Sequence, residues 1–430
     1  MCFRRYLFGF LLVSILVFVL SFIIGIYRGA FDVFFDKSTL SGTVFPACVR
    51  GVVVDSQFSG WRATYYVKGI NKGIVFTDRY PSYEYGDLLY VCGKGRSVDF
   101  NDGWYGKYLF GQRIYFSVQA NKITRLNDKR EFFSFFRWLY LLKTNFQFKI
   151  REIFGEPYAG LVSGLILGSR DDVSPDLQEK FRIDGLSHVM AVSGYNVTLL
   201  ILVSLSFLRF LSRKKRFIFS AVFIFLFSIL TGLTASVVRA AIMGSLYIIA
   251  ALFSRKYFVL SSLAAAVFVM IAINPRIVLY DAGFQLSFLA TIGLVYLSPV
   301  IGHYFKNISG ILGIKDLILI TLSAQIVSFP LIVVSFGKFS LVAPLANLFV
   351  LPLVPVSMFF GFFAGYLSFF SDVIGGVFGF FGYLILRIMI FFVEFFAGLS
   401  FAEISLEIKS GPWIFIYYAC LVFFVSRRKA

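Results

Sequence analysis

The segment FIFSAVFIFLFSILTGL (residues 217–233) contains no charged side chain and directly follows the basic run Arg213-Lys214-Lys215-Arg216. A helix rises about 1.5 Å per residue, so a stretch of this kind approaches the ~30 Å thickness of the hydrocarbon layer of a bilayer. The rest of the chain has the same character, since it is 58% hydrophobic, contains 56 Phe and has a mean hydropathy of +0.81. These values exclude an ordinary soluble domain and predict a helical membrane protein.

Further apolar stretches predict about ten membrane spans. The first, 7–27, follows Arg4 and Arg5 and is longer than the apolar core of a typical signal peptide, so we expect a spanning helix rather than a cleaved leader. The other nine lie at roughly 188–212, 217–233, 236–253, 257–274, 280–301, 316–335, 341–365, 375–398 and 412–426.

The basic residues between these spans predict the orientation of the chain. In this arrangement one side carries Arg4-Arg5, 213–216, Arg255-Lys256, Lys306 and 427–429, and the positive-inside rule makes that side cytoplasmic. Both termini are then cytoplasmic. The net charge of +18, from 41 Lys and Arg against 23 Asp and Glu, suits contact either with anionic lipids or with a polyanionic substrate, and charge alone does not choose between them.

Residues 42–126 predict a small β domain outside the membrane. Hydrophobic runs become short there, and β-branched and aromatic residues alternate with polar ones. Five short strands are typical of an OB-like barrel, although another small β fold has the same periodicity. We expect these strands at Val49–Asp55, Arg62–Ile70, Ile74–Asp78, Leu88–Gly93 and Ile114–Ala120.

The expected β domain interleaves cations with aromatic rings. Residues 45–126 contain 11 Lys and Arg against 6 Asp and Glu. A surface for single-stranded nucleic acid needs cations for phosphates and rings for stacked bases, whereas packing within the barrel would explain many of the rings equally well. The candidate DNA-binding cations are Arg50, Arg62, Lys68, Lys72, Lys94, Arg96, Lys107 and Arg113.

The cysteines and histidines limit which disulfides and metal sites the sequence can form. Cys48 and Cys92 fall in the β domain, where an extracytoplasmic location makes a disulfide plausible, and two free buried thiols fit the spacing equally well. His188 and His303 are the only histidines in the sequence, and no Cys/His cluster has metal-ligand spacing. We therefore expect no metal and no cofactor.

The expected N-terminal helix and its linker (1–41) precede the β domain, and residues 127–184 connect that domain to the helical region 185–430. Within the connection, 131–156 mixes aromatic and basic residues, which predicts an amphipathic helix on the membrane surface. The short apolar segment 159–168 and the polar 169–184 predict a re-entrant or interfacial element.

Several polar side chains fall inside the apolar segments. Such groups are costly in hydrocarbon unless they are paired or face water, so they either line a cavity or join helices. A charge such as that of Arg239 is the most expensive, and Asp281 is a candidate partner for it. Pro330 interrupts the span that contains Gln325, and Pro352 and Pro355 follow Asn347, which predicts broken or kinked helices. The candidate channel-lining residues are Ser187, His188, Ser193, Asn196, Arg239, Gln285, Ser287, Gln325 and Asn347.

Four segments in this order resemble the membrane domain of the ComEC-type competence proteins. They are GLSHVMAVSGYNV (185–197), ASVVRAAIM (235–243), AGFQLSFLATIGL (282–294) and AQIVSFPLIVVSFGKFSLVAPLANLFVLPLVPV (324–356). DGWYGKYLFGQRIYF (102–116) is similar to the end of that family's OB-like domain. The resemblance implies a channel that conducts single-stranded DNA across the cytoplasmic membrane during natural transformation.

The sequence departs from the family pattern in two places. Tyr195 and Asn196 stand where many members have Leu and His, so the resemblance assigns no imidazole role at that point. Many members also continue into a metallo-β-lactamase-like domain, whereas this sequence ends at Ala430 and has no His-x-His-x-Asp-His motif. We therefore expect a short form of the family, without enzymatic activity of its own.

The resemblance also implies partners. Besides single-stranded DNA and membrane lipids, we expect a periplasmic DNA receptor, a separate nuclease and a cytoplasmic ATP-driven motor resembling a helicase, because this chain has no Gly-x-x-x-x-Gly-Lys-Ser/Thr loop. Two other functions stay open. One is a transporter of a small anionic solute or lipid precursor, with Arg239 binding the anion. The other is a membrane enzyme in which Asp184 would support His188 as a base.

Overall fold

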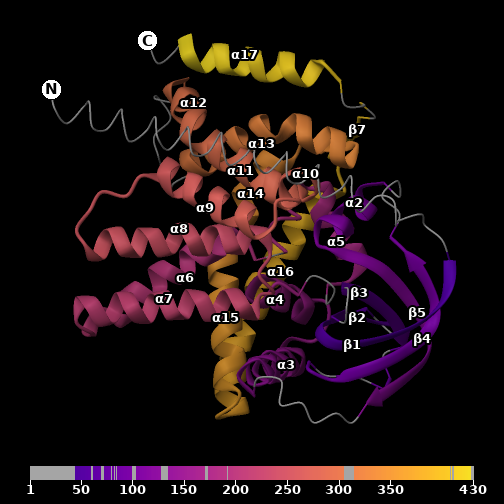
Figure 1. Cartoon of the computed structure of the whole chain (residues 1–430). Coiled ribbons are helices and arrows are strands. Elements are labelled where there is room, and N and C mark those ends of the chain that lie inside the picture. Colours follow the sequence, from indigo (N-terminus) through magenta and orange to yellow (C-terminus); the bar gives the residue numbers. More distant parts are fainter. Residues whose placement is uncertain are drawn as a thin grey trace. The chain divides into compact units, whose positions relative to one another are not determined.

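The computed structural model describes residues 44–427, with gaps at 60–61, 69–71, 79, 82, 84, 99–102, 127–133, 170–172, 191, 305–313, 407 and 409–410 (Figure 1). Residue contacts divide the chain into two units. The first is Met1–Phe148 with Phe225–Ala282, and the second is Lys149–Ile224 with Gly283–Ala430. The expected first span, 7–27, lies outside the described residues.

Five strands of the first unit close into a barrel, which confirms the small five-stranded domain predicted from the sequence. Neighbouring strands follow the order β1-β2-β3-β5-β4, with β3 and β5 parallel and the other pairs antiparallel. The strands are β1 (Val44–Ser59), β2 (Arg62–Lys68), β3 (Lys72–Asp78), β4 (Leu88–Ser97) and β5 (Ile114–Leu126).

The barrel interior follows the two-residue periodicity of the strands. Each strand contributes inward side chains that are almost completely buried, including Val53, Tyr65, Val75, Leu89 and Val118. The buried hydroxyl of Tyr65 accepts a hydrogen bond from the backbone N–H of Tyr83 at 3.1 Å, so this polar atom is satisfied within the core. Of the aromatic residues in the β domain, Tyr65 is thus a core residue.

The structure differs from the sequence-based expectation in an additional helix and in strands β1, β4 and β5, which are all longer than predicted. β1 is longer than 49–55, because it pairs with β4 along its first part and with β2 along its second, with a register shift between Val53 and Asp55. Helix α2 (Gly103–Gly111) was not expected. Its Leu109 packs against Ile74, Val98 and Ile114. Because Ile74 alternates with the interior residue Val75, α2 covers the outside of the barrel.

The first unit also contains helices α8 (Ala235–Leu252), α9 (Val259–Ile273) and α10 (Ile277–Tyr280). α8 and α9 pack against each other. Helices α3 (Ser134–Phe154) and α7 (Arg213–Leu230) are each divided between the two units. α3 exposes Phe135, Trp138 and Phe148 together with basic side chains, as the amphipathic reading of 131–156 requires, and its place on the membrane surface stays a prediction.

The second unit is helical apart from one pair of short strands, β6 (Lys338–Ser340) and β7 (Glu403–Ser405). The helices are α4 (Tyr158–Leu167), α5 (Pro175–Ile183), α6 (Gly194–Phe207), α11 (Ala282–Tyr296), α12 (Ser298–Tyr304), α13 (Ile314–Phe336), α14 (Ala343–Val350), α15 (Leu353–Leu367), α16 (Asp372–Ala397) and α17 (Trp413–Arg427). Helix α13 continues through Pro330, so the chain is not broken at this proline, and a kink there stays a prediction. Pro352 stands at a 42° bend between α14 and α15.

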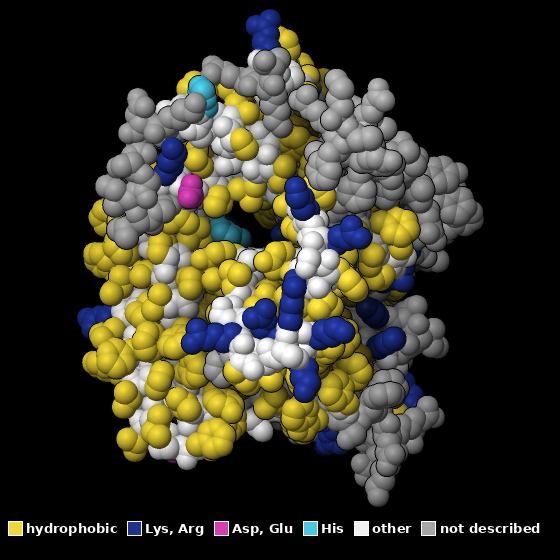
Figure 2. Space-filling model, turned by 90° about the vertical axis from the view of Figure 1, so that its left-hand side faces the viewer, with side chains coloured by type: hydrophobic (Ala, Val, Ile, Leu, Met, Phe, Trp, Pro, Cys, Tyr) yellow, Lys and Arg dark blue, Asp and Glu magenta, His cyan; other side chains and the backbone are white. Residues whose placement is uncertain are grey.

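The helices identify a membrane protein without fixing the number of spans. Among the described residues, three helices are long and apolar enough to cross a bilayer, in α8, α13 and α16. The number rises to five if the bent pairs α11–α12 and α14–α15 each form one span. Figure 2 shows one face of the molecule, on which hydrophobic side chains predominate and Lys and Arg gather in patches. The predicted ten spans stay a prediction.

Candidate functional site

One group of candidate DNA-binding cations lies on the outer face of β1 and β4. Arg50 pairs across the strands with Tyr90, and Lys94 and Arg96 follow along β4 at two-residue spacing. All four side chains are exposed, whereas the residues that alternate with them, such as Leu89 and Val91, are buried in the core. We call these four residues the outer face.

A disulfide lies within the outer face. Cys48 and Cys92 stand opposite each other in the β1–β4 ladder and are bonded, with their Cα atoms 4.1 Å apart. The sequence allowed both a bonded and a free pair, and the structure has the bonded one. This crosslink joins the two strands that carry Arg50 and Lys94. Cys420, in contrast, is a free and exposed thiol.

A second group of candidate cations lies at one end of the barrel. Lys68 stands opposite Lys72 in the β2–β3 hairpin, and Lys72 stands opposite Ile114, which follows Arg113. Desolvation lowers the pKa of Lys72, and the charges of Lys68 and Arg113 lower it further. The three exposed cations are therefore close enough to repel one another. We call Lys68, Lys72 and Arg113 the end cluster.

The two other candidate cations stand apart from these groups. Lys107 is exposed on α2. Arg62 begins β2 opposite Ser59 and Asp78, and its side chain lies outside the described part. Sequence reasoning did not single out Arg125, which binds the buried Asp87 at 2.6 Å, so its charge is already compensated within the barrel.

Sequence reasoning also missed the contact that joins the barrel to the link between α9 and α11. The side-chain amide of Asn274 donates to the carbonyl oxygen of Gly111 at 2.9 Å. The amide of Gln112 donates to Asp281 Oδ2 at 3.0 Å. Asp281 thus has a partner in the β domain, while its expected pairing with Arg239 stays a prediction. The signal in the sequence was the short link 274–281, in which Asn274, Arg276 and Asp281 stand between two apolar segments.

Arg276 lies at the centre of this contact, which we call the corner contact. Its side chain is 6% exposed, and its guanidinium carbon lies 4.6 Å from the centre of the Phe110 ring. Its Nη1 donates to the hydroxyl of Tyr115 at 3.3 Å. A buried cation is tolerated only with such partners, so these interactions fix α2 and the start of β5 against α10.

Two of the candidate lining residues in 185–197, Ser193 and Asn196, form a bridge to α4. The hydroxyl of Ser193 donates to Asn196 Oδ1 at 3.3 Å, and Asn196 Nδ2 donates to the carbonyl oxygen of Leu165 at 3.2 Å. Asn196 is buried, so in this structure its amide joins helices. The exposed ring of His188 lies 3.2 Å, through Nδ1, from the carbonyl oxygen of Gly185.

The other candidate lining residues are distributed over both units. Ser187 is half-buried in the turn after α5, and Arg239 is half-buried on α8. Gln325 on α13 donates to the carbonyl oxygen of Ser340 at 2.9 Å. Gln285 and Ser287 are half-buried on α11, and Asn347 is buried on α14. A role for these residues in lining a passage stays a prediction.

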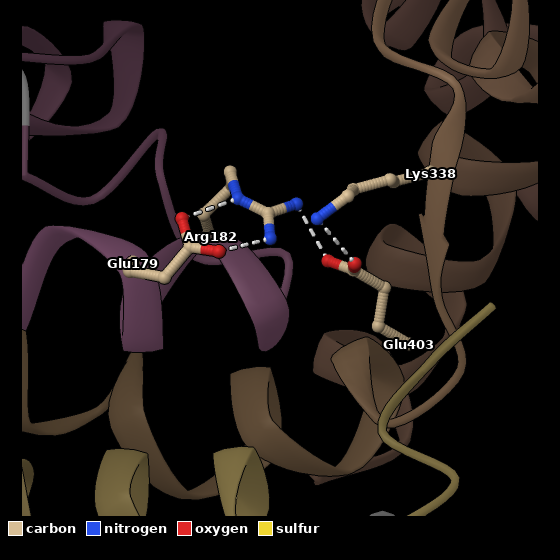
Figure 3. A network of polar contacts seen from close by, with 4 residues as sticks. All are labelled: Glu179, Arg182, Lys338 and Glu403. Atoms are coloured by element: carbon tan, nitrogen blue, oxygen red, sulfur yellow. Dashed lines mark hydrogen bonds and ion pairs between the residues drawn. The ribbon is translucent and has the colours of Figure 1, made fainter. Parts of the chain in front are cut away.

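A four-residue ion-pair network ties α5 to the small β6–β7 sheet (Figure 3). Arg182 binds Glu179 at 2.5 Å on its own helix and Glu403 of β7 at 2.5 Å. Lys338 of β6 binds the second oxygen of Glu403 at 3.0 Å. The bond to Arg182 lowers the pKa of Glu179. Two cations and two carboxylates balance within this network.

Asp184 follows the network along the chain and is completely buried. Neither of its carboxylate oxygens accepts a hydrogen bond from a described residue. Burial raises the pKa of Asp184 to about 7, because an ionised carboxylate loses its hydration there. The sequence suggested Asp184 only as a partner for His188, and burial rather than residue type distinguishes it.

Comparison with known proteins places the helical part of the chain in one family. Residues 165–430 match the family model described as competence protein. The chain is also similar to ComE operon protein 3 of Bacillus subtilis (strain 168), with 27% identity over 269 residues, which cover 61% of this chain and 33% of that protein. The match thus spans a third of the relative's length. No solved structure matches the chain. Since the family model covers more than half of its residues, the chain belongs to the competence protein family, as a member of the ComEC type.

Proposed function

We propose that this chain conducts single-stranded DNA across the cytoplasmic membrane during natural transformation. The observation that carries the proposal is the family match over 165–430, which contains the helices with the candidate lining residues. The match also contains 274–281, the segment that the corner contact joins to the barrel. The proposal assigns transport, and no catalytic step, to these residues.

In this proposal the barrel is an OB-like module that captures the strand. The outer face offers Arg50, Lys94 and Arg96 to phosphates and the exposed ring of Tyr90 to a base. The end cluster adds three cations whose mutual repulsion is relieved when a phosphate binds between them. Neutralised phosphates release counterions, so binding weakens as salt rises.

The polar residues of the helices would form the path of the strand. Ser187, Arg239 and Gln285 are each half-buried, so a modest separation of the helices would bring them into contact with water. The movement of DNA needs an energy source, which we assign to a cytoplasmic motor. A periplasmic receptor and a separate nuclease would deliver the single strand. We also propose the multi-pass topology with cytoplasmic termini and an extracytoplasmic barrel.

Thiol labelling of the full chain in vesicles tests the path. The background carries Cys2→Ser and Cys420→Ser, and the bonded Cys48 and Cys92 do not react. We expect Ser187→Cys and Gln285→Cys to react with a charged, water-soluble thiosulfonate, and single-stranded DNA to slow both reactions. The matched control is Phe391→Cys, on a residue of α16 that is 62% exposed and is expected to face lipid.

The outcomes separate the alternatives. A lack of reaction with the thiosulfonate at both Ser187→Cys and Gln285→Cys would contradict a hydrated path. Labelling that DNA leaves unchanged, but that small phosphate-containing anions slow, would favour the transporter of a small anionic solute or lipid precursor. Labelled-DNA uptake by cells that express the modified variants then links the positions to transport.

A further inference from the structure

Helix α5 ends in a geometry that fixes Asp184 at its last turn. The N–H of Leu186 donates to the carbonyl oxygen of Phe181 at 2.7 Å, and the N–H of Gly185 donates to that of Arg182 at 3.0 Å. Gly185 has a φ of +69°, so this is a Schellman ending with glycine in the left-handed conformation. The Asp184 side chain therefore projects from a rigid backbone rather than from a loop.

The end of α5 meets the start of α14. A Cβ atom on Gly185 would lie 2.8 Å from Ala343 Cβ and 3.5 Å from Ser340 Oγ, so only glycine fits. Asn347 follows Ala343 by one helical turn on the same face of α14. Asp184 directly precedes this close approach, Ser340 takes part in it and Asn347 lies one turn beyond it, and all three residues are buried. We call this region the junction.

This junction contains oxygen atoms without hydrogen-bond partners. Within the described part of the chain, nothing hydrogen-bonds to Asp184 Oδ1, Asp184 Oδ2, Ser340 Oγ or Asn347 Oδ1. Asp184 is 0%, Ser340 8% and Asn347 5% exposed. Buried polar atoms are rarely left in this state, so each such group calls for a specific explanation.

The charges around the junction favour an added positive charge. Arg182 and Lys338 are already bound to Glu179 and Glu403. Lys180 binds both Asp176 and Glu394. A carboxylate at the C-terminal end of a helix also faces the negative end of the helix dipole. An ionised Asp184 is thus uncompensated within the described part of the chain unless a cation joins it, and a bound proton is the alternative.

We propose that Asp184, Ser340 and Asn347 bind a small monovalent cation, Na⁺, between α5 and α14. The ligands are one carboxylate and neutral oxygens, which match a single positive charge and a hard ion, whereas Ca²⁺ sites gather more carboxylates. Helix C-terminal ends and neighbouring carbonyl groups serve as sodium ligands in membrane transporters. Asn347 is also one of the candidate lining residues, but sodium binding does not rest on the proposed transport of DNA. The ion would hold α5 to the α13–α14 connection.

Thermal unfolding and radioactive sodium binding of the purified full chain test the site. At constant ionic strength with choline as the replacement, we expect the unfolding midpoint to rise with the logarithm of the sodium concentration. Asp184→Asn should abolish this dependence and the sodium binding, and Ser340→Ala should weaken sodium affinity at least tenfold. The matched control is Asp176→Asn, which removes an exposed carboxylate from the same helix and should leave sodium affinity unchanged.

Each remaining outcome counts against the site. Stabilisation by sodium, potassium and choline alike would show a general salt effect. A sodium response that survives in Asp184→Asn would place the ion elsewhere. An unfolding midpoint that depends on pH but not on sodium would show that Asp184 binds only a proton. If Asp184→Asn does not fold, unchanged sodium affinity in Ser340→Ala and Asn347→Ala overturns the proposal.

Discussion

The guanidinium of Arg276 lies 4.6 Å from the centre of the Phe110 ring, so a residue of the α9–α11 link stacks on a residue of α2. We expect Arg276→Ala to destabilise the chain by about 1–3 kcal/mol, because it removes a buried cation–π contact and the hydrogen bond to Tyr115. Thermal unfolding in detergent measures the loss.

Two further variants control for charge at Arg276. Arg276→Lys keeps the positive charge but not the planar group, so an intermediate loss is expected. Arg255→Ala removes a cation from the exposed link between α8 and α9 and should be nearly neutral. Equal stability of Arg276→Ala and the wild type would show that the corner contact does not hold α2.

Removal of the end cluster should weaken the binding of single-stranded DNA. In the full chain, Lys68→Ala, Lys72→Ala and Arg113→Ala together should make the negative slope of log K against log salt shallower by about 2. Each lost phosphate contact removes about 0.7 from its magnitude. Fluorescence anisotropy with a labelled oligonucleotide over a salt series measures this slope. The control removes three exposed charges from α7, with Arg213→Ala, Lys214→Ala and Lys215→Ala. An equal change of slope in both triple variants would show that the end cluster acts only through the overall charge of the protein and is not a specific DNA-binding site.

Reduction of the Cys48–Cys92 disulfide should destabilise the barrel. The bond closes a loop between residues 44 positions apart, and such a crosslink contributes about 2–4 kcal/mol by restricting the unfolded chain. In a Cys420→Ser background, we expect dithiothreitol to lower the unfolding midpoint. The Cys48→Ser/Cys92→Ser variant should start at the lower midpoint and show no response to reductant. A wild type indifferent to reductant would speak against a stabilising role.

Two glycines of α16 should respond oppositely to the same substitution. A Cβ on Gly379 would lie 2.3 Å from Ile153 Cγ2, whereas one on Gly376 meets nothing within 4 Å. We expect Gly379→Ala to cost about 1–3 kcal/mol through overpacking and Gly376→Ala to gain about 0.5–1 kcal/mol through helix propensity. Unfolding of both variants in the same detergent compares them, and a neutral Gly379→Ala would contradict the close packing.

Local patterns in the sequence predicted the class of the protein and the barrel. The uninterrupted apolar composition of 217–233 is enough to predict a span. The alternation of residues around Val75 is likewise enough to predict a strand. Helix α2 was missed because glycines begin, interrupt and end it, and its helical form depends on the packing of Leu109 against Ile74.

The site residues that sequence reasoning missed depend on distant partners. Gln112 and Asp281 are 169 residues apart, so nothing near either residue announces their hydrogen bond. Asp184 has an ordinary polar neighbourhood in the sequence, and only the folded chain encloses it. Pro330 shows the opposite limit, because a residue that often ends a helix lies inside the continuous helix α13.

The short β6–β7 pairing has a mechanical consequence for the second unit. Hydrogen bonds from Leu341 to Ala402 and from Leu406 to Gly337 extend it on both sides, so the segment from α14 to α16 leaves and returns at one point. The two ends of this segment are thus held together, so they cannot move apart unless these hydrogen bonds break. Any rearrangement that widens the helical part should therefore move the start of α14 and the end of α16 together, as long as the β6–β7 pairing persists.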